Sequence, residues 1–289
     1  MANILAVGVA TIDWIQVVDE YPAVDTELRA REQHLWRGGN ATNTLVVLSQ
    51  LGHTCSWLGT LADDTFADLI CRDLDKYNIN YSHCHRVPDS VSPSSHILLS
   101  EASGSRNIVH YRELPELLAA DASDIDYTKW DWLHFEGRNV AETALLMQQV
   151  RSQVPNVTIS LELEKPRDRI EQLFGYADVL LCGQHFARAH GHNSGEGFLK
   201  AMQTDLPGTC EMICAWGKQG AFFMSENGEV LTVPAFAQEK VIDSRAAGDV
   251  FNAAYIDARV QGLSLAESIE SACKLAGHKC GHQGLDGFV

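Results

Sequence analysis

The sequence is poor in basic residues relative to acidic ones. Its 289 residues include 22 Lys and Arg against 38 Asp and Glu, which gives a formal net charge of −16. Nucleic acids and anionic membranes bind proteins through accumulated positive charge, so this balance argues against both as partners. A nucleotide is not excluded, because a phosphate cradle can be built from backbone N–H groups and one or two basic side chains.

The sequence also lacks an export signal and a long apolar run. The segment from Met1 to Ala10 is apolar, but it has no basic region before it and runs directly into Asp13, which predicts no signal peptide. No apolar run is long enough to span a bilayer. We therefore expect a cytoplasmic protein.

None of the eight cysteines belongs to the paired CxxC or Cys/His half-sites of a zinc site. The segments 83–85 and 278–282 hold several His and Cys residues close together, yet clusters of this kind are usually incidental. The cysteines lie mostly in apolar stretches, which predicts reduced, packed thiols and no structural metal.

Short apolar runs alternate with helical patterns along the chain. The run from Ile4 to Val9 is typical of a buried parallel strand, and it ends at Asp13, where a strand's carboxyl end would present a ligand group. Further strand-like runs lie at 55–59, 96–100, 132–135, 157–161, 179–182 and 212–215. Helical patterns separate many of them, for example at 64–77 and 141–153, and another runs from Asn40 to about Leu51, where Gly52 ends it. This alternation predicts one α/β domain over residues 1–289, with a mostly parallel sheet covered by helices on both faces.

A second pattern interrupts this alternation near the N-terminus. Residues 14–18 and 28–36 alternate apolar and polar side chains, and a turn at 22–26 lies between them. Such alternation is typical of a half-exposed antiparallel sheet. We expect a small β lid formed mainly by residues 14–37 and part of 81–112.

The most informative segment runs from Asp243 to Asn252. Small residues at 246–248 lead into a helix predicted from about Ala247 to Gln261. The start of a helix offers free N–H groups and a positive dipole end to an anion, and small side chains let that backbone approach phosphate closely. Asp249 could there accept a hydroxyl proton while the amides stabilise the charge on the phosphoryl group. The alternative is an ordinary helix start, with glycine for packing and aspartate for the dipole.

Two motifs resemble those of the ribokinase/phosphofructokinase-B family. The segment Asp243-Ser-Arg-Ala-Ala-Gly-Asp249-Val-Phe is similar to its signature Asp-Thr-x-Gly-Ala-Gly-Asp-x-Phe, and residues 38–43 carry its Gly-Gly-Asn-x-x-Asn. Within that family, segments 36–43, 134–139, 162–167 and 277–289 are most similar to the ketohexokinases. The resemblance implies a ribokinase-like three-layer α/β/α sandwich with a β lid, and an ATP-dependent sugar kinase.

The resemblance also implies roles for individual residues. It makes Asp249 the catalytic base and the amides of Ala246, Ala247 and Gly248 the anion hole. It assigns the sugar to five residues, namely Asp13, Asp25, Gly39, Asn40 and Asn43. The alternative for Asp13 and Asp25 is a pair of solvated turn residues, and for Asp25 only the resemblance favours the sugar over this alternative. Carboxylates and amides nevertheless suit the oriented hydrogen bonds that discriminate between sugar hydroxyls.

On the nucleotide side, the resemblance brings Arg106 to the ATP phosphates, where the alternative is an exposed turn cation. It places adenine and ribose against Ala215, Gly217, Gly220, Phe236 and Cys273. The glycines in that set would equally suit an ordinary hairpin between the strands that flank them.

Phosphoryl transfer requires Mg²⁺ to bridge the phosphate oxygens, and Glu136, Glu162 and Glu164 are the candidate acids, acting through water. For Glu162 and Glu164, the alternating run 161–164 leaves an exposed strand face as the competing interpretation. The Asn-x-x-Glu motif of the wider family is not evident at 182–187. The family also implies a monovalent cation such as K⁺ near the Asp243 loop.

One departure from the family signature concerns the anion hole. Ala246 stands where the signature has its first glycine, and Ser244 replaces its threonine. Alanine keeps the N–H group but disfavours a positive φ, so the loop must either avoid that conformation or be strained. Arg245 adds a cation beside the phosphate site.

The leading hypothesis is a ketohexokinase-like enzyme that phosphorylates the 1-hydroxyl of D-fructose. Its alternatives are a kinase of another ketose, a sulfosugar, ribose or a nucleoside, and a catalytically silent binding protein. The lid should expose an apolar face, with Trp14, Ile15, Val17 and Leu35 as candidates, so we expect a homodimer formed through the lids. The alternative is a lid that folds back on its own cleft.

Overall fold

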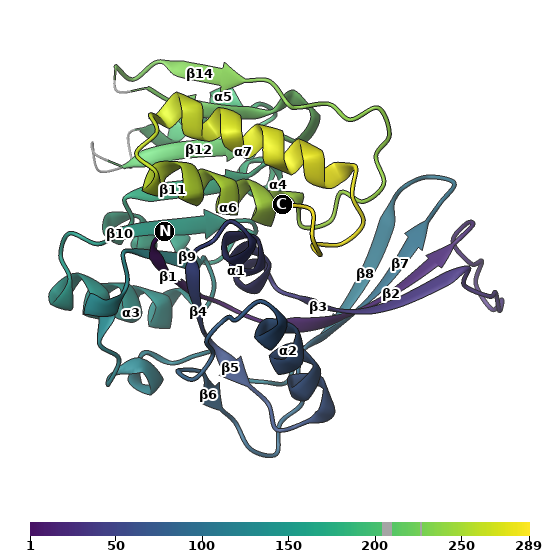
Figure 1. The fold of residues 1–289 in the computed structure, drawn as a ribbon. Coiled ribbons are helices and arrows are strands. Elements are labelled where there is room, and N and C mark those ends of the chain that lie inside the picture. The colour runs from purple at the N-terminus through teal and green to yellow at the C-terminus, as the bar shows by residue number, and fades with distance from the viewer. Residues whose placement is uncertain (204–209, 226) are drawn as a thin grey trace.

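The chain folds into a layered body from which a smaller sheet projects (Figure 1). The computed structural model describes residues 1–203, 210–225 and 227–289. Its large sheet has the strand order β14-β13-β12-β11-β10-β9-β1-β4. These strands are β1 (Asn3–Val7), β4 (Thr54–Leu58), β9 (Trp132–Glu136), β10 (Thr158–Leu163), β11 (Val179–Gly183), β12 (Glu211–Ala215), β13 (Ala221–Met224) and β14 (Val230–Val233). The six strands from β4 to β12 are parallel to one another. β13 pairs antiparallel with β12, and β14 pairs antiparallel with β13.

Helices cover both faces of this sheet (Figure 1). One hydrophobic core contains residues of α1 (Asn40–Gln50), α2 (Thr65–Lys76), α6 (Ala247–Val260) and α7 (Leu265–Cys280). The other contains residues of α3 (Val140–Gln153), α4 (Gln184–Ala189), α5 (Gly195–Met202) and the 3₁₀ helices η1 (Ala119–Ala122), η2 (Tyr127–Lys129) and η3 (Ile170–Tyr176). In β1, Ile4 and Ala6 belong to the first core and Leu5 and Val7 to the second. Burial on both faces explains why this strand is a continuous apolar run, and the predicted α/β/α sandwich is confirmed.

The smaller sheet has the strand order β3-β2-β7-β8. It consists of β2 (Thr11–Val18), β3 (Glu32–Gly38), β7 (Ser94–Ser100) and β8 (Arg106–Tyr111), and a two-stranded sheet pairs β5 (Thr60–Leu61) with β6 (His85–Arg86). The small sheet is not purely antiparallel as expected, because β2 and β7 are parallel. The chain passes through α1, β4 and α2 between these two strands, and such a long connection permits parallel pairing.

Local sequence signals set several element boundaries. The Asp64 side chain accepts a hydrogen bond from Ala67 N and begins α2, while Ser264 and Glu267 form a capping box at the start of α7. The predicted positions of Asp13 and of the start of one strand were wrong. Asp13 lies inside β2 and not at the end of the first strand, and the strand expected from Leu28 begins only at Glu32. Among the described residues, no helix is both long and apolar enough to cross a membrane.

Candidate active site

A cleft of about 1020 Å³ lies where the carboxyl ends of β1, β9, β10, β11 and β12 meet the small sheet. Most residues predicted to form a site line it. They are Asp13, Gly39, Asn40, Asn43, Arg106, Glu136, Glu162, Glu164, Ala215, Ala246, Ala247, Gly248 and Asp249. A cleft of this size can hold both a sugar and a nucleotide.

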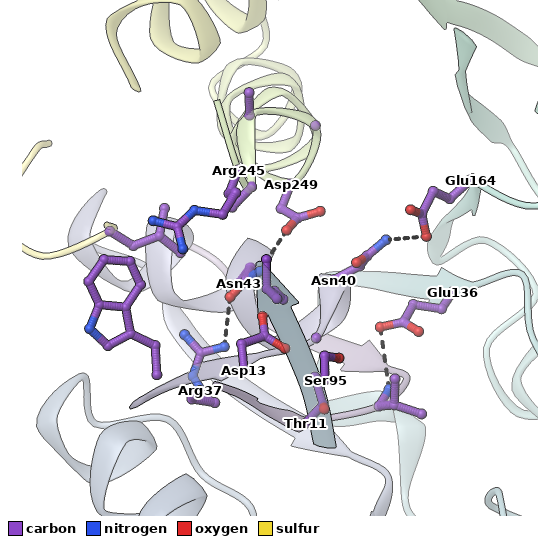
Figure 2. A pocket seen from close by; sticks show the side chains of 18 of the residues that line it. Thr11, Asp13, Arg37, Asn40, Asn43, Ser95, Glu136, Glu164, Arg245 and Asp249 are labelled. Carbon is purple, nitrogen blue, oxygen red and sulfur yellow. Dashed lines mark hydrogen bonds between the residues drawn. The ribbon is translucent and has the colours of Figure 1, made fainter. Parts of the chain in front are cut away.

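Asp249 lies buried in the first turn of α6, at the edge of the cleft. Asn43 Nδ2 donates a hydrogen bond of 2.7 Å to Asp249 Oδ2, and Asn43 Oδ1 accepts one of 2.8 Å from Arg37 Nη1 (Figure 2). Burial raises the pKa of Asp249 well above its usual range, and the nearby carboxylates of Glu164 and Glu136 raise it further. A carboxylate that binds a proton readily and is held in one orientation is suited to general-base catalysis.

The loop before α6 settles the question that Ala246 raised. Ala246 has φ 57° and ψ 8°, the left-handed conformation in which an alanine costs roughly 1–2 kcal/mol. The loop therefore adopts the backbone that a glycine would adopt freely, and surrounding contacts hold it there. Asp243 Oδ1 accepts from Arg245 N at 3.0 Å and from Arg245 Nε at 2.8 Å, directly before the strained residue.

Gly248 lines the cleft, and neither its backbone conformation nor its neighbours require a glycine. Its φ is not positive, and a Cβ added there would meet no atom within 4 Å. A glycine in the first turn of a helix, beside open space, leaves its backbone accessible to a ligand. This feature supports an anion site at the start of α6 over an ordinary helix start.

We expect Gly248→Ala to separate stability from activity. Alanine in a helix is favoured over glycine by roughly 0.5–1 kcal/mol, so the unfolding midpoint should stay the same or rise. The added methyl group would hinder close approach of phosphate to the backbone, and kcat/KM should fall by about tenfold or more. Thermal unfolding and steady-state kinetics measure the two effects. Unchanged kinetics would show that no phosphate approaches this backbone.

Tight glycine contacts position the other side of the site. Gly39, with φ 107°, precedes α1 and lies so close to the carbonyl oxygen of Val9 that no side chain fits. A Cβ on Gly8 would lie 2.6 Å from the Glu136 carboxyl group. That group accepts hydrogen bonds from Ala41 N at 2.7 Å and from Val9 N at 3.3 Å, so one oxygen of Glu136 serves to cap α1 (Figure 2).

Glu162 of β10 and Glu164, which directly follows this strand, differ in their surroundings. Glu162 is buried, so the exposed strand face considered for this run is wrong for it. Its Oε1 accepts a hydrogen bond of 3.1 Å from Asn252 Nδ2, while its Oε2 is buried without a partner. Glu164, half exposed, accepts from Asn40 Nδ2 at 3.2 Å. Burial, followed by the charge of Asp249, raises the pKa of Glu162 well above its usual range.

These acids could hold Mg²⁺ only in part. In the described residues, no group of three or more His, Cys, Asp or Glu is arranged to bind a metal alone. Mg²⁺ usually keeps several waters and uses one or two carboxylates together with substrate phosphates. The orphaned Oε2 of Glu162 is the group that best fits such a role.

Asp13 and its neighbours form the small-sheet wall of the site. Burial raises the pKa of Asp13, whereas a hydrogen bond with Ser95 and the charges of Arg37 and Arg245 oppose this effect. Gly38 packs against the Asp13 carboxylate so closely that a Cβ would collide with it. Asp13 therefore has a fixed position on the cleft.

Sequence reasoning missed two functional features of this region. The Arg37 side chain is only 3% exposed, and it binds Asp73, Thr42 and Asn43 at 2.6–2.8 Å. The charge of Arg245 lies 4.8 Å from the ring centroid of Trp36, which links the small sheet to the loop before α6. The sequence offered one sign of a role for Arg37, its position directly before Gly38-Gly39.

Five residues expected in the site do not line the cleft in this chain. Asp25 lies exposed with φ 58° in the connection between β2 and β3, away from the cleft lining. Cys273 is buried in the core beside α6, and Phe236 is half exposed. Gly217 is the first residue of the short helix η5 (Gly217–Gln219), and Gly220 directly follows it. Gly220, with φ 89°, packs against the Val233 carbonyl oxygen. The hairpin between β12 and β13 therefore explains this glycine without a ligand.

The whole chain matches a known family. The model of the pfkB family carbohydrate kinases matches residues 1–288. This chain is a pfkB family carbohydrate kinase. It is 35% identical to the ketohexokinase of Mus musculus over 294 residues, which cover 99% of each protein. It is 25% identical to the ribokinase of Dictyostelium discoideum, over 95% of this chain and 93% of that one.

The fold agrees with this membership. The ribokinase structure from Giardia lamblia superposes with a TM-score of 0.86 at 16% identity, over 100% of this chain and 95% of that one. The kinase is thus ATP-dependent, and the ribokinase-like fold expected from the two motifs is confirmed. The roles of individual residues remain predictions, to which the geometry above adds physical reasons.

Proposed function

We propose that this kinase transfers the γ-phosphoryl group of ATP to the 1-hydroxyl of a small ketose, with D-fructose as the leading substrate. The observation that carries the proposal is the buried Asp249 carboxylate, which lies beside an open helix N-terminus in the same cleft as Asp13 (Figure 2). One carboxylate thereby serves the reacting hydroxyl, and the other is free to orient the sugar. The 35% identity to a ketohexokinase supports a ketose as the substrate class.

The proposed reaction uses Asp249 as the general base. Its carboxylate accepts the proton of the sugar hydroxyl while the sugar oxygen forms a bond to the γ-phosphorus, and the bond from that phosphorus to the β-bridging oxygen breaks to release ADP. Asn43 and Arg37 hold the base in place, so little reorganisation accompanies proton transfer. The amides of residues 246–248 stabilise the transferred group, and Arg106 and Arg245, which line the same cleft, supply positive charge to the phosphates.

Mg²⁺ bound with ATP supplies charge neutralisation between the β- and γ-phosphates. Glu162 would hold it, with Glu164 and Glu136 contributing through water. The other residues have separate tasks: the small sheet covers the cleft and excludes water, and Asp13, Asn40 and the Gly39 backbone orient the sugar. Asn43 is proposed to orient the base as well as to bind the sugar, because each end of its amide makes one hydrogen bond and keeps one more donor or acceptor position for a ligand.

The alternatives within the family differ only in the acceptor. Carboxylates and amides bind any polyol, so a second ketose, a sulfosugar, ribose or a nucleoside remains a competitor, and a ribokinase is among the relatives. A silent binding protein is disfavoured by the intact base and by its supporting contacts. The strained Ala246 does not favour it, because the loop adopts a left-handed conformation that a glycine would adopt freely.

The test measures ADP release with a panel of D-fructose, other ketoses, a sulfosugar, ribose and nucleosides, at fixed ATP and Mg²⁺. We expect kcat/KM to be highest for D-fructose and the product to carry phosphate on the 1-oxygen. Preference for ribose or a nucleoside would overturn the ketose assignment. No stimulation by any sugar would overturn the proposed function.

We also propose that the small sheet mediates a homodimer. Of the four apolar residues expected to be exposed, Leu35 is exposed, Trp14 is half-buried, and Ile15 and Val17 are buried. Ile108 and Val109 of β8 are exposed as well, so that Leu35, Ile108 and Val109 are 41–71% exposed. Leu35 and Ile108 lie on the cleft side. A second copy would cover these side chains. Light scattering measures the mass, and a monomer at high concentration would favour a lid that closes on its own cleft instead.

A further inference from the structure

A buried lysine lies beneath the loop that precedes α6. The Lys279 side chain is 1% exposed, and its Nζ donates to the Asp243 carbonyl oxygen at 2.9 Å, to Asp243 Oδ2 at 3.1 Å and to the His282 carbonyl oxygen at 3.1 Å. An ammonium group has three donors. All three are therefore used, and the oxygens that surround the charge come from two separate segments of the chain.

These contacts tie the loop before α6 to the turn after α7. Asp243 also accepts from Gly284 N at 3.1 Å, and Ile242 N donates to the Cys280 carbonyl oxygen at 2.7 Å. On its other side, the Asp243 carboxylate binds Arg245, the residue before the strained Ala246. Lys279 thus supports, through Asp243, the backbone that presents the 246–248 amides to the cleft.

Asp243 and Lys279 shift each other's pKa in the direction that favours their charged forms. Burial alone would raise the pKa of Asp243, but the hydrogen bond from Arg245 and the charge of Lys279 lower it to about 2. Burial lowers the pKa of Lys279, and the charge of Asp243 opposes that effect. Three oxygens surround the Lys279 nitrogen, one of them from the Asp243 carboxylate, and this arrangement suits an ammonium group and offsets the burial of both side chains.

A monovalent cation at this loop, which family membership implied, does not fit the residues present. The carbonyl and carboxylate oxygens that could bind K⁺ here already face the Lys279 ammonium, and a second cation beside it would be repelled. We propose that Lys279 is a built-in cation that positions the anion-hole loop, and that this loop binds no monovalent ion. Its effect on catalysis rests on the proposed function, but its effect on the loop does not.

The experiment compares Lys279→Gly with Lys279→Met. The glycine variant removes the ammonium and leaves a space lined by three oxygens into which K⁺ fits, whereas methionine fills much of that space without a charge. ADP affinity by calorimetry and the thermal unfolding midpoint are measured in KCl and in tetramethylammonium chloride of equal ionic strength. These two readouts require no turnover, and kcat on the best sugar of the panel is the third.

We expect the wild type to bind ADP equally in both salts. The glycine variant should lose about tenfold or more in ADP affinity in tetramethylammonium chloride, since it leaves buried acceptors unpaired, and KCl should restore several-fold of that loss. The methionine variant should lose affinity in both salts without recovery. If turnover fails on every sugar, the proposed function is wrong while the two binding and unfolding readouts still decide this proposal.

Two results would overturn the inference. One is a wild type whose ADP affinity or unfolding midpoint rises selectively with K⁺, which would show a cation site in spite of Lys279. The other is a glycine variant that behaves as the wild type in both salts. If neither variant folds, the wild-type comparison alone decides, because a selective K⁺ effect refutes the proposal and its absence supports it.

Discussion

Asp249→Asn is expected to lower kcat by about a thousandfold or more, within the range usual for a general base, while sugar and ATP bind nearly as before. Asparagine has the same shape as aspartate, so its carbonyl oxygen can still accept the hydrogen bond from Asn43. It cannot accept the hydroxyl proton. Stopped assays of ADP release and calorimetric binding of the sugar measure the two quantities separately.

The matched control is Asp13→Asn, the same chemical change elsewhere in the cleft. Asp13 is assigned to orient the sugar, so its replacement should raise KM more than it lowers kcat. A kcat within tenfold of the wild type for Asp249→Asn would disprove the role of Asp249. In the wild type, activity should fall as the pH decreases through the pKa of Asp249, which burial raises above the value of an ordinary aspartate.

Glu162→Gln is expected to change stability and activity in opposite directions. Folding raises the pKa of Glu162, so the folded chain binds more protons than the unfolded chain above the unfolded pKa of about 4.3. The free energy of unfolding of the wild type must therefore decrease as the pH rises from the unfolded pKa to the raised pKa of Glu162 in the folded chain. Glutamine does not ionise, so the variant should match the wild type near pH 5 and exceed it at pH 8 without Mg²⁺, by about 2 °C in unfolding midpoint.

The same variant should be catalytically poor. With Mg²⁺ and ATP present, kcat/KM should fall by about 10- to 100-fold, because the orphaned buried oxygen proposed to hold the metal is lost. Glu164→Gln is the control next to this strand end. It removes only the contribution of the Glu164 charge to the raised pKa of Glu162, so it should change the pH dependence of stability less than Glu162→Gln does. An equal pH slope in the wild type and in Glu162→Gln would show that Glu162 does not ionise in this window.

The order of elements could be read from the sequence because local patterns determine it. The continuous apolar run of β1 and the small residues before α6 predicted a buried strand and a helix from Ala247, and both are present. The register of the small sheet could not be read in this way. Alternation predicts a strand, but the pairing of β2 with β7 depends on where the chain returns after α1 and α2.

The sequence predicted which residues line the cleft more completely than it predicted their contacts. Motif resemblance brought Asp13, Asn43 and Asp249 together, and the structure places all three on one cleft. Asn43, predicted to bind the sugar, contacts Asp249, and Phe236 and Cys273, predicted to bind the nucleotide, are not among the residues that line the cleft. Burial of Glu162 was also not readable, because an alternating run has the same sequence in an edge strand as in β10, which lies between β9 and β11.

The sequence alone indicated the family and the α/β alternation and predicted Asp249 as base, since each of these depends on motifs whose residues are close together in the chain. Only the tertiary structure decided what supports that base and its loop. Asn43 and Asp249 are 206 residues apart, and Lys279 and Asp243 are 36 apart. Packing of α1 against α6 and of α6 against α7 creates these contacts, and it holds Ala246 in a conformation that its own propensity disfavours.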